Sequence, residues 1–273
     1  MRIPILFRSL LTSFGFAALS LGSQAFAGNF EVSPIRVDFD ASMRSSVLTI
    51  RNLSADDGVV VQARVVKWTQ VAGEDVITAT TDLIVNPPIF TLGSNSQQIV
   101  RIGPRDAALA ANNGAELPYR LILSEIPKPP SADFRGVGMT LTLSVPIFFA
   151  PSGTADQPLP QIATSRDATG RVIATVTNTG TKSFKVTRLT LANSVTKEAI
   201  DELTQVRYLL PASSVTWVFK PPLPTSASFT ISVMTERGVH SIEVKETQIG
   251  SLENPVASTD KPPNIPATSR QGD

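Results

Sequence analysis

Cysteine is absent from this chain of 273 residues, and histidine occurs once. Without cysteine there is neither a disulfide nor a thiol nucleophile, so stability must come from packing alone. A single histidine cannot build an ordinary zinc site or serve both a triad and a metal. His240 lies between Val239 and Ser241 in an alternating segment, which is the setting of a strand residue. We therefore expect no enzymatic activity, no metal and no cofactor.

The chain also lacks a large excess of positive or negative charge, and it has no long apolar run. The chain has 24 Lys and Arg against 23 Asp and Glu, which gives no general attraction for nucleic acid or anionic membranes. The apolar stretch at 10–21 is shorter than the roughly 20 residues that span a bilayer. It follows Arg2 and Arg8 and precedes the small residues of Ala25-Phe26-Ala27. This pattern predicts a signal peptide at 1–27, and no membrane insertion after its cleavage.

Short alternating runs rich in Val, Ile, Leu and Thr fill the segment 28–150. Alternation indicates strands that are buried on one face, because successive strand side chains point to opposite sides. The runs are Phe30–Phe39 with a break at Pro34, Ser46–Asn52, Val59–Trp68, Val76–Thr80, Ile89–Leu92, Gln98–Ile102 and Tyr119–Ile126. Many short strands separated by turn residues predict an immunoglobulin-like β-sandwich.

The longest alternating run begins at Val137. Met139, Leu141, Leu143 and Val145 continue its apolar row, and small polar side chains alternate with them. About nine residues of strict period 2 exceed the usual strand of five or six. Such a strand can lie at a sheet edge and offer its apolar row to another chain, or it can fill the core of its own domain, an alternative that stays open for Val145.

A second β-rich region follows a proline-rich break at 151–160, which we interpret as a linker. Its alternating runs are Arg171–Asn178, Lys185–Ala192, Tyr208–Leu210, Val215–Phe219, Ser228–Val233 and Gly238–Val244. The sequence thus predicts an all-β protein of two immunoglobulin-like sandwiches, 28–150 and 161–247, that meet at an angle. The polar, proline-rich segment 248–273 reads as a disordered tail.

Several segments of the first domain resemble the periplasmic pilus chaperones of chaperone-usher systems, the PapD-like family. The most specific is Tyr119-Arg-Leu-Ile-Leu-Ser-Glu-Ile-Pro127, which is similar to the family's tyrosine-to-Glu-Ile-Pro motif. The other matching segments are Ser33–Phe39, Val47–Asn52, Asn86–Leu92, Gln98–Ile102 and Leu141–Pro151. Their order covers the whole first domain.

The resemblance implies a non-enzymatic chaperone of the periplasm that binds pilus, fimbrial or coat subunits and passes them to an outer-membrane usher. Members of the family lend a strand to an incomplete subunit, which is donor-strand complementation. In this chain the lending row would be Val137, Met139, Leu141, Leu143 and Val145. An exposed apolar edge would also permit self-association.

The resemblance further implies a pair of basic residues that bind the C-terminal carboxylate of the subunit. Arg36 falls on the first position, and a guanidinium suits a carboxylate because its fork matches two oxygens. The family's second position, a lysine, is held here by Pro146, and Ala150 replaces an arginine; these departures resemble the archaic branch. Arg101 and Arg120 are the candidates for the second anchor, although either could be a solvated strand arginine.

A protein of another class fits the same composition. An exported adhesin or carbohydrate-binding module made of two β-sandwiches would also lack catalytic residues and carry a signal peptide. Neighbouring genes for an outer-membrane barrel and small secreted β-subunits would favour the chaperone.

Overall fold

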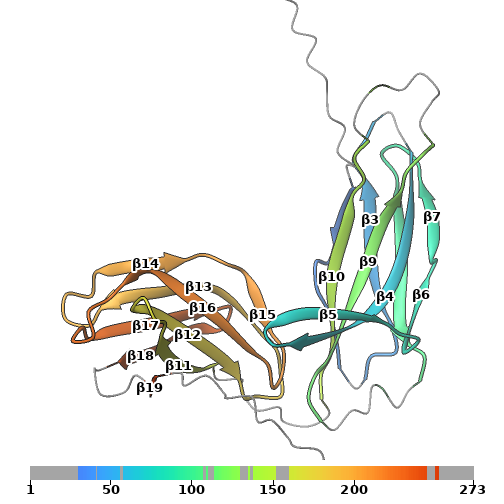
Figure 1. The fold of residues 1–273 in the computed structure, drawn as a ribbon. Coiled ribbons are helices and arrows are strands. Elements are labelled where there is room, and N and C mark those ends of the chain that lie inside the picture. The colour runs from blue at the N-terminus through green and yellow to red at the C-terminus, as the bar shows by residue number, and fades with distance from the viewer. Residues whose placement is uncertain are drawn as a thin grey trace, which may run out of the picture.

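The structure is a computed structural model of two β-sandwiches set at an angle (Figure 1). It describes residues 30–40, 42–55, 58–106, 109, 114–129, 135, 138–151, 160–244 and 250–251. The expected all-β class and the two immunoglobulin-like domains are confirmed. The expected signal peptide lies outside the described residues, as does most of the expected linker.

The first domain consists of two facing sheets. Its strands are β1 (Phe30–Ser33), β2 (Val37–Phe39), β3 (Ser46–Asn52), β4 (Val59–Val71), β5 (Glu74–Ala79), β6 (Leu83–Asn86), β7 (Ile89–Leu92), β8 (Gln97–Pro104), β9 (Leu117–Ile126) and β10 (Thr142–Phe149). One sheet has the order β1-β3-β8-β6, and the other has the order β2-β10-β9-β4-β5 with β7 paired to β4. The second of these sheets carries the expected lending strand.

The core of the first domain lies between these sheets. Alternate side chains of β3 and β9, among them Leu48, Ile50, Leu121 and Leu123, are fully buried in one cluster. Each fully buried side chain of this size contributes roughly 1.5–3 kcal/mol from burial. The period-2 burial of these strands is the physical basis of the alternation seen in the sequence.

The second domain repeats the two-sheet plan with its own core. Its strands are β11 (Pro160–Arg166), β12 (Arg171–Asn178), β13 (Phe184–Asn193), β14 (Ala199–Leu203), β15 (Arg207–Leu209), β16 (Ser214–Pro222), β17 (Phe229–Thr235), β18 (Gly238–Val244) and β19 (Gly250–Ser251). The sheet orders are β16-β12-β11-β19 and β14-β13-β17-β18, with β15 paired to β13. Phe219, Phe229 and Trp217 are large members of the buried cluster between them.

Two segments differ from the sequence-based expectation. The long strand was expected over 137–145, whereas β10 runs over Thr142–Phe149. At the other end, Gly250–Ser251 fall within the expected tail but pair in parallel with Ser165 and Arg166 of β11. Pairing of this kind uses only backbone groups, so no pattern of apolar side chains predicts it.

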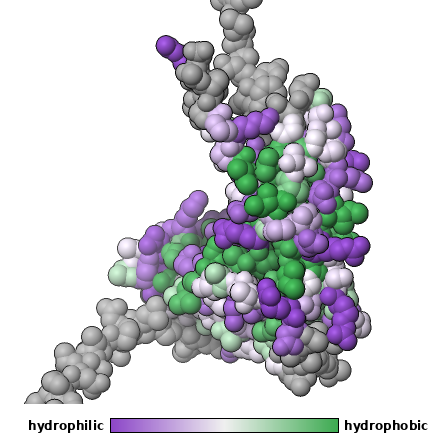
Figure 2. All heavy atoms as spheres, turned by 90° about the vertical axis from the view of Figure 1, so that its right-hand side faces the viewer, coloured by the Kyte–Doolittle hydropathy of each residue, from purple (hydrophilic) through white to green (hydrophobic). Residues whose placement is uncertain are grey.

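Apolar side chains also reach the surface away from the domain cores. Figure 2 shows them mixed with polar ones on the face that lies to the right in Figure 1. Ile84, Ile89 and Ile99 of the first domain are each about half exposed, at 47%, 53% and 51%. Among the described residues, no helix is long and apolar enough to cross a membrane.

Candidate functional site

Strand β10 has a neighbour on both sides over only part of its length. β9 pairs with it from Thr142 to Phe149, in antiparallel register. On its other side β2 pairs only with the last three residues, Ile147 to Phe149, in parallel. Within the described strands, the edge of β10 from Thr142 to Pro146 therefore has no partner, and its backbone groups there are available for pairing with another chain.

The apolar row beside this edge emerges gradually from the core. Val145 is 4% exposed and belongs to the buried cluster, while Leu143 and Leu141 are partly buried and pack against that cluster. Met139 is 57% exposed. Leu141 is held in place because its carbonyl oxygen accepts a hydrogen bond from Glu125 N (2.9 Å). Val137, the fifth predicted residue of the row, lies outside the described residues.

The opposite face of β10 turns toward the second domain and packs in an aromatic cluster. Phe148 contacts Trp68 and Tyr208, with ring centroids 6.0 and 5.7 Å away. Trp68 and Tyr208 meet edge to face at 5.4 Å. Trp68 and Phe148 are buried together with Leu210 of the second domain. Because Tyr208 and Leu210 come from the second domain, this cluster joins the two sandwiches.

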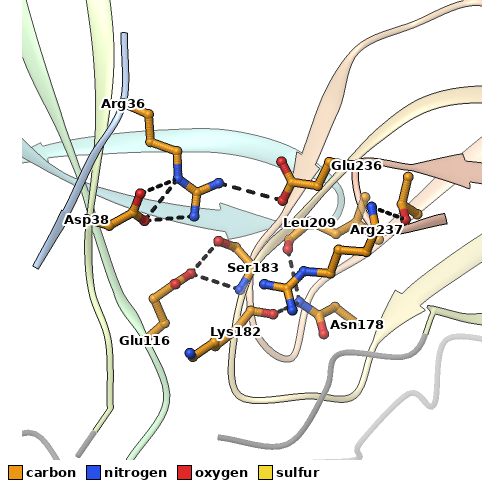
Figure 3. A network of polar contacts seen from close by, with 10 residues as sticks. Arg36, Asp38, Glu116, Asn178, Lys182, Ser183, Leu209, Glu236 and Arg237 are labelled. Atoms are coloured by element: carbon orange, nitrogen blue, oxygen red, sulfur yellow. Dashed lines mark hydrogen bonds and ion pairs between the residues drawn. The ribbon is translucent and has the colours of Figure 1, made fainter. Parts of the chain in front are cut away.

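Arg36 lies at the margin of the aromatic cluster, in the link between β1 and β2. Its Cζ is 4.5 Å from the centroid of the Phe148 ring. Its Nε and Nη2 donate to Asp38 at 2.8–2.9 Å, and Nη1 lies 3.6 Å from Oε1 of Glu236 in the second domain (Figure 3). Burial alone would lower the pKa of Arg36, but hydrogen bonds and charge from Asp38, with the charge of Glu236, raise it. Arg36 is therefore cationic at every physiological pH.

Arg120 lies on the other side of the same cluster. Its Cζ is 3.7 Å from the centroid of the Trp68 ring, and its Nη2 is 3.1 Å from Oδ2 of Asp75. Burial lowers the pKa of Arg120, and the charge of Asp75 opposes that change. Arg120 is directly opposite Pro146 in the β9–β10 register. Directly opposite residues share a face of the sheet, so Arg120 stands next to the position where the family has a lysine.

Arg101 is not part of this arrangement. It is exposed on β8, in the other sheet of the first domain, opposite Val47 and Asn86. The structure thus brings Arg36 and Arg120 to one aromatic cluster and leaves Arg101 on a different surface.

Polar contacts hold the second domain against this site. The side-chain amide of Gln70 donates to the carbonyl oxygen of Tyr208 (2.8 Å) and accepts from the backbone N of Leu210 (3.0 Å). Arg207 donates to the carbonyl oxygen of Gly73 (2.7 Å), in the turn between β4 and β5. In Figure 1 the β4–β5 hairpin correspondingly reaches the second domain near β15.

Glu116 makes a further connection between the domains. Its Oε2 accepts hydrogen bonds from the backbone N of Ser183 (2.8 Å) and from the Ser183 hydroxyl (Figure 3). Burial raises the pKa of Glu116, while the hydrogen bonds of Ser183 and the charge of Arg36 act to lower it.

The comparisons with known proteins agree with this architecture. Residues 29–155 match the family model described as Pili and flagellar-assembly chaperone, PapD N-terminal domain. Over its first domain, the chain is therefore similar to this family. Chaperone protein LpfB of Salmonella typhimurium is 28% identical over 149 residues, which are 54% of this chain and 60% of LpfB. The match to LpfB therefore spans less than two thirds of that protein.

The solved structures that resemble this chain cover both domains. One belongs to the CsuC-CsuE chaperone-tip adhesion subunit pre-assembly complex from the archaic chaperone-usher Csu pili of Acinetobacter baumannii. It is 20% identical, covers 82% of this chain and 100% of its own, and has a TM-score of 0.58. The E. coli chaperone DraB is 17% identical with a TM-score of 0.52, over 81% of this chain and 97% of its own. At these identities the likeness shows the fold.

Several residues of the site carried no signal in the sequence. Trp68, Gln70, Tyr208 and Glu236 come from strands or turns with no distinctive motif, and the last two lie in the second domain. A tryptophan on an otherwise ordinary predicted strand was the only available hint, because large aromatic residues are common where surfaces become buried.

Proposed function

We propose that this protein is a pilus assembly chaperone of the chaperone-usher type, which binds secreted subunits by donor-strand complementation. After export to the periplasm and removal of residues 1–27, it would hold a subunit and deliver it to an outer-membrane usher. The branch of the family would be the archaic one. The match of the first domain to the PapD family model and the likeness of both domains to chaperone structures support this function.

The observation that carries the proposal is the open edge of β10 beside a half-exposed apolar row. Main-chain hydrogen bonds along an unpaired edge give affinity that tolerates different sequences, and alternate side chains give fit. A subunit with a missing strand would pair with Thr142 to Pro146 and cover Met139, Leu141 and Leu143. The core of the first domain would then continue into that of the subunit.

Arg36 and Arg120 are the proposed anchors for the terminal carboxylate of the subunit. Both guanidinium groups lie over rings of the aromatic cluster, which fixes their position. Charge-assisted hydrogen bonds from such fixed groups are stronger than those between neutral groups. Arg120 would supply the cation that Pro146 cannot provide.

The proposal is tested by co-expressing the chaperone in the periplasm with the pilus subunit of its own operon and purifying through a tag on the chaperone. We expect a one-to-one complex with the wild type, and its loss with Leu141→Asp, with Arg36→Ala and with Arg120→Ala. These side chains are not in the fully buried core, so circular dichroism should show that the variants remain folded.

Two matched substitutions serve as controls. Ile99→Asp places the same charge on an exposed apolar residue of the other sheet, and Arg101→Ala removes an exposed arginine there. Both should retain the subunit. A complex that survives both Leu141→Asp and Arg36→Ala would show the donor-strand role to be wrong, and a complex lost with Arg101→Ala but kept with Arg120→Ala would reassign the second anchor.

A further inference from the structure

Two of the three guanidinium nitrogens of Arg36, Nε and Nη2, donate hydrogen bonds within the first domain. Asp38 accepts from Nε and Nη2, and it is fixed opposite Phe148 in the β2–β10 register. The remaining nitrogen, Nη1, faces the second domain, where Oε1 of Glu236 lies 3.6 Å away (Figure 3). This separation exceeds the 2.7–3.2 Å of a hydrogen bond. Arg36 and Glu236 therefore form an ion pair without a hydrogen bond.

The position of Glu236 is fixed by a backbone hydrogen bond and does not depend on its side chain. It belongs to the turn between β17 and β18, and its backbone N donates to the carbonyl oxygen of Lys185 (3.1 Å). Its side chain is 32% exposed. The carboxylate can therefore leave Arg36 for solvent while the turn stays where it is. The guanidinium has no such freedom, because Asp38 and the ring of Phe148 hold it.

We propose that Glu236 occupies, in the empty chaperone, the place on Arg36 that the terminal carboxylate of the subunit takes. This inference rests on the proposed function, and it names a specificity-determining residue of the anchor. The incoming carboxylate needs the nitrogen that Asp38 leaves available, and that nitrogen faces Glu236. Both carboxylates cannot occupy this side at once, because one nitrogen, Nη1, faces it, and the incoming carboxylate would lie directly against the like charge of Glu236.

The competition gives the anchor its selectivity. A small free carboxylate must displace Glu236 by its own affinity, which is weak for a partly exposed site. A carboxylate at the end of a strand already added to β10 arrives at a high effective concentration and needs no such affinity. Glu236 thus favours chain ends presented by a bound strand over free carboxylates in solution.

The test uses the full mature chain and two synthetic peptides of alternating valine and threonine, identical except that one ends in a carboxylate and the other in an amide. Binding is followed by fluorescence anisotropy. Glu236→Gln removes the competing charge at nearly constant volume and leaves the backbone hydrogen bond to Lys185 in place. We expect the carboxylate peptide to bind about two- to five-fold more tightly to this variant, with the affinity of the amide peptide unchanged.

Glu243→Gln is the matched control, since Glu243 is an exposed glutamate on the adjoining strand β18. It should leave both affinities as in the wild type. Sodium acetate provides a second readout: it should weaken binding of the carboxylate peptide to Glu236→Gln more than to the wild type. If Glu236→Gln leaves the carboxylate peptide unchanged or weaker, the inference is wrong.

Arg36→Ala separates this inference from the proposed function. It should reduce the difference between the two peptides in either background, and Arg36→Ala combined with Arg120→Ala should abolish that difference, because Arg120 is the second anchor. If Arg36→Ala reduces the difference while Glu236→Gln has no effect, the anchor stands and the competition does not. If the difference is unchanged without Arg36, or neither peptide binds the wild type, the proposed function fails and this inference fails with it.

Discussion

At the scale of the residue, the pKa of Glu116 is changed by the contact between the two domains. Glu116 is 6% exposed. Its carboxyl group accepts from the backbone N and the hydroxyl of Ser183, and its backbone N donates to the carbonyl oxygen of Thr181 (2.7 Å). Burial raises its pKa above the ordinary value of 4.5. The folded protein therefore keeps a proton on Glu116 at pH values where the unfolded chain has lost it. The stability from this proton is fully present below the unfolded pKa and is lost as the pH rises through the folded pKa.

Glu116→Gln should remove this pH dependence. The amide oxygen can still accept from Ser183, and the side chain no longer titrates. As the pH rises above about 4.5, the free energy of unfolding should fall less for Glu116→Gln than for the wild type, as measured by urea denaturation. Glu243→Gln, which changes an exposed glutamate, should follow the wild type. Parallel curves for the wild type and Glu116→Gln would contradict the assignment.

At the scale of the element, β10 divides into a fixed half and an open half. Ile147 is fully buried, and Phe149 stacks on Phe39 with ring centroids 4.3 Å apart and meets Tyr119 edge to face at 5.8 Å. Met139, before the strand, is largely exposed. One continuous segment thus serves the core at one end and a free edge at the other.

The two halves should respond oppositely to truncation. Ile147→Ala removes a buried side chain from a packed core and should lower the free energy of unfolding by about 2–4 kcal/mol. Met139→Ala should change it by less than about 0.5 kcal/mol and should instead weaken the complex with the subunit. Denaturant unfolding measures the first quantity and co-purification the second. A comparable loss of stability for both variants would mean that Met139 already belongs to the core.

The strands that alternation predicted are those with one buried face, such as β3 and β12, where burial follows period 2. β11 and β14 were missed because their side chains are mostly partly exposed or charged. The end of β10 was misplaced for the opposite reason. From Val145 to Phe149 every residue is buried, with the core on one face and the aromatic cluster on the other, and a strand buried on both faces shows no alternation.

The candidate site was predictable only where a motif marked it. Arg36 and Arg120 lie in segments that resemble the family, so the sequence pointed to both. Glu236 and Tyr208 meet them from the second domain, across separations of more than about 80 residues, and no local pattern encodes such a contact. The distinction between Arg120 and Arg101 likewise required knowing which sheet each strand joins.

At the scale of the whole molecule, the tip of the β4–β5 hairpin makes several of the contacts that hold the two sandwiches at their angle. Gln70 satisfies one backbone carbonyl and one backbone N–H of the second domain. Gly73 approaches that domain so closely that a Cβ there would lie 3.2 Å from the carbonyl oxygen of Ser214, at a φ of +82° that favours glycine. These contacts come from a hairpin whose two strands are paired along their length, and they oppose bending between the domains.

Gln70→Ala should loosen this junction. It leaves the carbonyl of Tyr208 and the N–H of Leu210 without their partner, which costs about 1–3 kcal/mol for buried groups. Small-angle X-ray scattering should show a wider range of shapes, and calorimetry should separate the unfolding of the two domains. Gln97→Ala, at an exposed position of β8, is the control and should resemble the wild type. Unchanged scattering for Gln70→Ala would place the control of the angle elsewhere, in the aromatic cluster.

The short parallel pairing of β2 with β10 has a consequence for the direction of a guest chain. Arg36 immediately precedes Val37, the first residue of β2, so a guest lying along Thr142 to Pro146 meets the start of β2 head to tail. To bring its last residue to Arg36, the guest must run in the same direction as β10. Any residues beyond that last one would collide with β2, so the open edge of β10 would accept the terminus of a polypeptide and exclude its interior.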